Sequence, residues 1–121
     1  MENLVKMFNQ FVLEEAREVQ CEMVYSEYYK KWMALNYGSC EYDIPGVRMM
    51  NSLEDIVDEL LTCVAFHTMV LPGFKEADII KQIGMVKEYL ESWVPKVSSY
   101  MTVTEDDVNH LCNTILDSVY R

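Results

Sequence analysis

The first glycine or proline of this 121-residue chain is Gly38. Helix interiors tolerate these two residues least, so a long stretch without either is typical of a helix. We therefore expect a first helix over about residues 3–35. The turn-forming residues Pro45 and Gly46 follow soon after Gly38. They predict a loop or long connection over residues 36–52, with room for a short extra helix.

Three further helices are expected. The second spans about residues 52–70 and stops at the sequence LPG, and the third spans about residues 75–93, before a proline. The fourth begins at the sequence TEDD, where Thr104 is a suitable N-cap and Asp107 can complete a capping box. Strand-like alternation of apolar and polar residues occurs only in a few residues after the third helix.

Helices of this length predict one all-α domain over residues 1–121, a four- to five-helix bundle. The second helix is apolar on nearly every side after Leu60, in the sequence LTCVAFHTMV. A helix of this kind is buried on more than one side, and a bundle of this size rarely encloses one fully. We therefore expect an oligomer, either a homodimer or a homotetramer.

The charge and the cysteines limit the classes of function. The chain has 20 acidic and 10 basic residues, a formal net charge of −10, which disfavours binding to nucleic acid. No CxxC pair occurs among the four cysteines, so a zinc site is poorly supported and free thiols are expected. No apolar run is long enough for a membrane span, and no secretory leader is apparent. These features predict a cytoplasmic protein that is not bound to a membrane.

Acidic residues stand where the expected helices should be apolar. On a helical wheel of the first segment, Glu15 lies near the middle of the arc that holds Phe8 and Val12, and Glu18 lies at its edge. In the second helix, Asp55 and Asp58 are three residues apart and lie on an arc that becomes apolar further along. Like charges this close require something positive between them, and all-oxygen ligands favour a hard divalent cation.

Two motifs carry a resemblance to a known family. The sequence EEAREV at residues 14–19 matches EExxE, and EDIVDEL at residues 54–60 carries DxxD, close to ExxD. In this order they resemble the motifs of the all-α nucleotide pyrophosphohydrolases, the MazG-like and dimeric dUTPase superfamily. The first acid of the second motif is Asp55 where that family usually has glutamate, and Glu54 stands beside it as an alternative.

The resemblance implies an oligomeric, Mg²⁺-dependent enzyme, with Mn²⁺ as a possible substitute. It would cleave a nucleoside triphosphate, possibly dUTP, to the monophosphate and pyrophosphate. The resemblance implies metal ligation by five acids: Glu14, Glu15, Glu18, Asp55 and Asp58. Glu15, Glu18 and Asp58 would also be catalytic. Four further residues would bind the substrate, with lysines at the phosphates and an aromatic ring on the base: Lys31, Trp32, Lys81 and Lys87.

Other interpretations of these residues stay open. Asp55 can be a capping residue, because acids are favoured at a helix N-terminus, and the glutamates of the first segment can form a solvated face. The alternative function is a non-catalytic helical protein–protein interaction module, such as a small viral or bacterial adaptor. The acidic surface, the tyrosine-rich first segment and the unassigned last helix favour that alternative.

Overall fold

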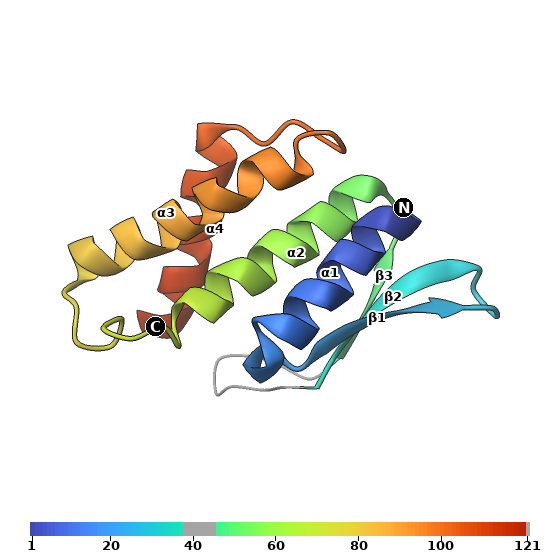
Figure 1. Cartoon of the computed structure of the whole chain (residues 1–121), viewed down its shortest axis with the longest axis horizontal. Coiled ribbons are helices and arrows are strands. Elements are labelled where there is room, and N and C mark those ends of the chain that lie inside the picture. The colour runs from blue at the N-terminus through green and yellow to red at the C-terminus, as the bar shows by residue number, and fades with distance from the viewer. Residues whose placement is uncertain (38–45, 121) are drawn as a thin grey trace. The chain divides into compact units, whose positions relative to one another are not determined.

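The computed structural model describes residues 1–37 and 46–120 (Figure 1). The chain forms two compact units, unit 1 from Met1 to Leu60 and unit 2 from Leu61 to Arg121. The elements are, in order, α1 (Glu2–Glu14), the short 3₁₀-helix η1 (Arg17–Val19), β1 (Cys21–Ser26), β2 (Lys31–Asn36), β3 (Gly46–Met50), α2 (Leu53–Thr68), α3 (Ile79–Val97) and α4 (Glu105–Tyr120). None of the helices in this part of the chain is long and apolar enough to cross a membrane.

The prediction of an all-α bundle is wrong. Within the described residues, four α-helices accompany a three-stranded antiparallel sheet of order β1-β2-β3. The expected helix over residues 3–35 ends at Glu14, and the second half of that segment forms β1 and β2. The third strand, β3, lies inside the expected connection over residues 36–52, of which residues 38–45 lie outside the described part. The fold is therefore α+β.

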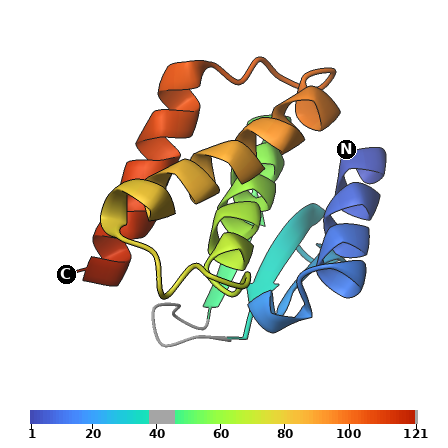
Figure 2. The ribbon, with the colours of Figure 1, turned by 60° about the vertical axis from the view of Figure 1, so that its left-hand side comes forward.

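Unit 2 contains the later turns of α2 together with α3 and α4, which contact each other (Figure 2). Helix α3 begins at the N-cap Asp78, whose carboxylate accepts the backbone N–H of Lys81 at 2.9 Å. It continues to Val97 and so includes Pro95, where the sequence predicted an earlier end. The three later helices are confirmed, with shifts of a few residues at their ends.

The capping box at the start of α4 is confirmed. The Asp107 carboxylate accepts the backbone N–H of Thr104 at 2.9 Å, and the Thr104 hydroxyl accepts the backbone N–H of Asp107 at 3.1 Å. The backbone N–H of Thr104, and then its side chain, lower the pKa of the Asp107 carboxyl. Each group satisfies a donor that the first helical turn would otherwise leave unpaired.

Replacing Asp107 by alanine is expected to lower the midpoint of thermal unfolding at pH 7. Because the folded-state pKa of Asp107 is depressed, its stabilisation is present above the unfolded pKa and is lost as the pH falls through the folded pKa. The gap between parent and variant should therefore close between about pH 4 and pH 2. Asp106→Ala is the control, because Asp106 is also in the first turn. An equal loss in both variants would contradict a specific role for the box.

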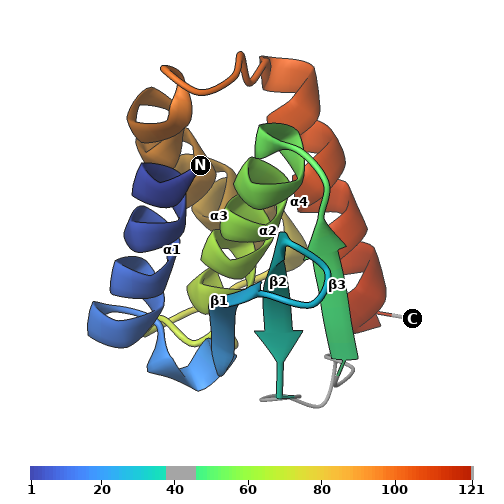
Figure 3. The same ribbon diagram turned by 90° about the vertical axis from the view of Figure 1, so that its right-hand side faces the viewer.

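Unit 1 arranges two helices around the sheet. Figure 3 shows α1 beside β1 and α2 behind β1 and β2. Asn9 of α1 donates to the Met23 carbonyl at 3.1 Å and accepts the Met23 N–H at 2.9 Å, so its amide satisfies the outer edge of β1. Unpaired strand edges invite aggregation, and this bond protects one of them.

The face of the sheet toward α2 is the inner face. Alternate residues point to it, and four of them are buried: Cys21, Met23, Ala34 and Met50. Arg48 points to the same face, since it lies opposite Ala34 in the register. The Arg48 guanidinium extends from this face to acids in the first turns of α2.

Candidate functional site

The acids of the first motif follow the end of α1. Glu14 is the last residue of that helix, Glu15 is its C-cap, and Glu18 lies in η1. Glu14 and Glu15 are exposed and Glu18 is half-buried. The expectation that Glu15 and Glu18 face the core from a continuous helix is therefore wrong. Their role as metal ligands stays a prediction.

The acids of the second motif surround Arg48. Its Nη1 atom lies 2.9 Å from Asp58 Oδ2 and 3.1 Å from Glu59 Oε2, and its Nη2 atom lies 3.4 Å from Asp55 Oδ1. We call these four residues the Arg48 cluster. Its local charge is −2, from three carboxylates and one guanidinium. A positive group thus lies between Asp55 and Asp58, as their spacing predicted, and in this structure it is an arginine.

Local hydrogen bonds fix Asp55 further. Its second carboxylate oxygen accepts the backbone N–H of Asn51 at 2.8 Å, and its own N–H is bound by the Ser52 hydroxyl at 3.2 Å. Asp55 therefore combines a capping role with the ion pair. Glu54, the alternative first acid of the motif, is exposed. The interpretation of Asp55 as a helix cap is thus confirmed, although that role does not exclude others.

The charge state of Arg48 is secured by its surroundings. Burial lowers the pKa of its guanidinium, but hydrogen bonds to Asp58 and Glu59, and the charges of both, act in the opposite direction and raise it overall. The arginine is therefore a permanent cation at any pH at which the protein is folded. It occupies the position at which the metal hypothesis places a divalent ion.

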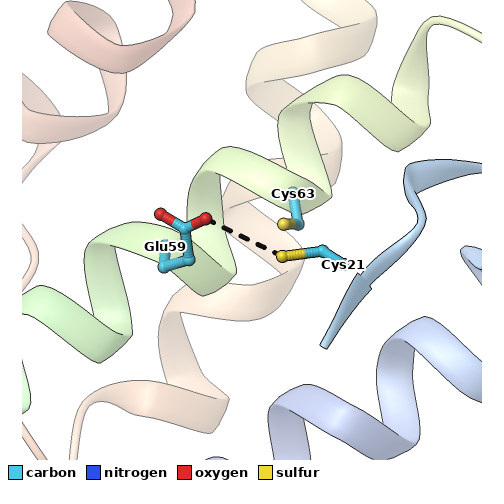
Figure 4. A group of neighbouring side chains, drawn as sticks. All are labelled: Cys21, Glu59 and Cys63. Carbon is cyan, nitrogen blue, oxygen red and sulfur yellow. Dashed lines mark hydrogen bonds between the residues drawn. The ribbon is translucent and has the colours of Figure 1, made fainter. Parts of the chain in front are cut away.

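Glu59, a member of the Arg48 cluster, also contacts the buried thiol of Cys21. Its Oε2 atom binds Arg48, while its Oε1 atom accepts the Sγ–H of Cys21 at 3.9 Å (Figure 4). Cys63 lies one helical turn after Glu59 on α2. Thiols and a carboxylate are ligands of Zn²⁺-like metals, whereas Mg²⁺ prefers oxygen throughout. The two acids of the second motif that were expected to bind Mg²⁺, Asp55 and Asp58, are both bound to Arg48.

The residues expected to bind a nucleotide are dispersed within each unit. Lys31 and Trp32 are neighbours on β2, so their side chains point to opposite faces of the sheet. Lys31 donates to the Asn51 side chain at 2.7 Å. In unit 2, Lys81 is exposed, and Lys87 lies 3.4 Å from Glu105 and 4.0 Å from Glu91. Neither pair presents one common surface to a triphosphate.

The loop that joins β1 to β2 carries the most exposed aromatic rings of the described residues. Tyr28 is 86% exposed and Tyr29 is 58% exposed, and their rings meet edge to face with centroids 4.8 Å apart. Tyr25 and Trp32 form a second edge-to-face pair in the strands below, at 5.4 Å. We call these four residues the aromatic hairpin. In Figure 1 it extends away from α1.

No protein-family model, curated protein or solved structure matches the chain. The resemblance to the all-α pyrophosphohydrolases is therefore corrected on two grounds. No family match supports it, and the sheet of unit 1 is incompatible with an all-α, MazG-like bundle.

Sequence reasoning missed Arg48, and it placed Trp32 and the tyrosines on a helix rather than on a β-hairpin. Arg48 lay in the expected connection, and the tyrosines lay in the expected first helix. Alternation of buried and exposed residues was the available signal for the strands, as in Cys21–Glu22–Met23 of β1. The signal for a hairpin was weak, because the loop between β1 and β2 contains no glycine to mark a turn. Lys30 adopts the left-handed conformation there, with φ of 55°.

Proposed function

We propose that the chain is a non-catalytic protein-interaction module that binds its partner with the aromatic hairpin. The observation that carries this proposal is the exposed edge-to-face pair of Tyr28 and Tyr29 rings at the end of a β-hairpin. A tyrosine ring can bury 150–250 Å², and leaving two of them in water forgoes that gain. Tyrosine and tryptophan are also the residues most enriched at the energetic centres of interfaces.

The hairpin reduces the cost of binding. Tyr29 donates its backbone N–H to the Ser26 hydroxyl at 3.1 Å, which fixes the turn, and the two rings restrict each other by edge-to-face packing. A side chain that is already ordered loses less entropy when a partner immobilises it. The expected partner is therefore a protein that offers an apolar cleft wide enough for two aromatic rings.

Hydrolysis of nucleoside triphosphates is the less supported proposal. It required inward-facing acids on two helices, with a metal between them. Asp55 and Asp58 are instead bound to an arginine, and Glu15 follows the end of α1 as an exposed residue. The Mg²⁺-dependent activity, the preference for dUTP and the oligomeric state all stay predictions.

The binding proposal is tested by cross-linking and titration. A photoreactive phenylalanine analogue at position 28 should cross-link one protein in the native host, whereas the same analogue at Tyr37 should not. With that partner purified, Tyr28→Ala and Tyr29→Ala should each weaken binding by about 30-fold or more. Tyr37→Ala is the matched control, because Tyr37 is 57% exposed and lies outside the hairpin. Both hairpin variants should keep the parent's thermal midpoint.

Thermal unfolding separates the two classes of function. With millimolar Mg²⁺ and a non-hydrolysable dNTP analogue together, we expect no shift of the midpoint. A rise of several degrees that needs both would indicate a ligand that binds only the folded state. Loss of that rise in Asp58→Asn would restore the metal-site hypothesis and contradict the non-catalytic proposal.

A further inference from the structure

The outer face of the sheet, which points away from α2, is apolar along its middle. It carries five such side chains, from all three strands: Val24, Met33, Leu35, Val47 and Met49. Val47 is 61% exposed and the other four are half-buried. An antiparallel sheet with one solvated face normally alternates apolar and polar residues, so apolar residues on both faces are typical of a sheet that is covered on both sides.

Two opposite charges mark the ends of this apolar strip. Glu22 lies on the outer face of β1, opposite Leu35 in the register, and Lys31 lies on the outer face of β2, opposite Ser26. Leu35 and Lys31 are four residues apart on one strand, so Glu22 and Lys31 are separated by roughly 13 Å along the strand direction. Both charged side chains are exposed. The outer face is thus acidic at one end and basic at the other.

We propose that a second copy of the chain covers this face, with the two sheets stacked face to face and their strands running in opposite directions. A two-fold axis in the plane of the interface, perpendicular to the strands, reverses the ends of the strip. It brings Lys31 of each copy to the end of the strip where Glu22 of the other copy lies, one strand away or roughly 4.8 Å to the side, and the apolar strips meet between the two ends. This contact is isologous, so each charge pair occurs twice.

The same charges disfavour the other symmetric stacking. A two-fold axis along the strands would keep the ends of the strip in place. Lys31 lies on the central strand β2, so that arrangement would set Lys31 over Lys31 of the second copy. Like charges brought together in an interface suppress the wrong arrangement. The antiparallel stacking is the one in which both the charges and the apolar side chains are complementary.

The size of the strip sets the expected strength. Three strands of about six residues, at roughly 3.3 Å per residue and 4.8 Å between strands, cover a footprint of about 280 Å² per copy. A stable dimer usually buries about 800 Å² per partner. We therefore expect a reversible dimer with a micromolar or weaker dissociation constant. The surface is distinct from the tip of the aromatic hairpin, and the inference does not depend on the function proposed above.

Charge exchange tests the arrangement. Sedimentation equilibrium of the full chain should show a concentration-dependent dimer. Glu22→Lys and Lys31→Glu should each weaken self-association by about 10-fold or more, because each creates two like-charge contacts. An equimolar mixture of the two variants should associate again, and so should the double variant, since both restore opposite charges at every contact. Lys75→Glu, at an exposed site in unit 2, is the control and should associate like the parent.

Three results would overturn the proposal. One is a parent chain that stays monomeric up to millimolar concentration, and another is a pair of single variants that associate as strongly as the parent. The third is stronger association of Lys31→Glu with the parent than of the parent with itself, which is what parallel stacking predicts. Val47→Glu should abolish the dimer without changing the thermal midpoint measured at low concentration, which shows that any loss is not a failure to fold.

Discussion

Replacing Phe8 by alanine is expected to lower the free energy of unfolding by about 3–5 kcal/mol, the usual cost of removing a fully buried aromatic ring. Phe8 is 0% exposed and lies on the buried side of α1 with Leu4 and Phe11. The loss combines the apolar area returned to water with the cavity left behind. Urea denaturation at 25 °C measures this loss in the free energy of unfolding. Phe8→Leu leaves a smaller cavity, so it should lose less stability and remain folded if Phe8→Ala does not fold.

Glu15→Ala is the matched comparison, because the helical wheel placed Glu15 on the same arc as Phe8. Since α1 ends at Glu14 and Glu15 is exposed, this change should alter the free energy of unfolding by less than about 0.5 kcal/mol. A large stabilisation in Glu15→Ala would indicate a carboxylate held against the core. That result would contradict the observed end of the helix.

The later helices could be predicted because their ends carry local signals. The capping box of Thr104 and Asp107 needs only residues that are close in sequence, and so does the cap of Asp55 by Ser52. Side-chain caps of this kind act within one helical turn, so they do not depend on the rest of the fold. The boundaries of α2 and α4 followed from them within a few residues.

The strands could not be predicted because their apolar spacing fits a helix equally well. Val19 and Met23 are both buried and four residues apart. Residues at that spacing share a side in a helix, and they share a face in extended chain as well. The usual turn signal is also missing, since Gln20 and Lys30 adopt positive φ values where glycine is normally found. A helix was therefore the simplest interpretation of a segment that forms a hairpin.

Part of the Arg48 cluster could be predicted from the sequence. The spacing of Asp55 and Asp58 correctly required a positive group, because two carboxylates on one turn repel each other. The identity of that group depended on β3, the strand just before α2, whose extended backbone directs Arg48 toward these acids. The spacing of two acids on a helix predicts that a positive group lies between them. Only the tertiary structure identifies that group as an arginine.

Replacing Arg48 by methionine is expected to lower the free energy of unfolding by about 1–2 kcal/mol at pH 7 and low salt, the second large effect. The variant leaves Asp55, Asp58 and Glu59 close together without their cation. The Arg48 side chain is 44% exposed, so solvent screening keeps the loss well below that of a fully buried ion pair. Urea denaturation at several salt concentrations measures it, and the gap from the parent should narrow as salt rises.

A second substitution identifies the origin of that loss. Because the folded-state pKa of Arg48 is raised, its stabilisation is complete at every pH below the unfolded pKa of arginine, so its own titration contributes nothing in acid. Adding Asp58→Asn to Arg48→Met removes one of the carboxylates that the variant leaves without a cation, and it should recover part of the stability at pH 7. No recovery in the double variant would mean that Arg48 acts through the packing of its aliphatic chain rather than through its charge.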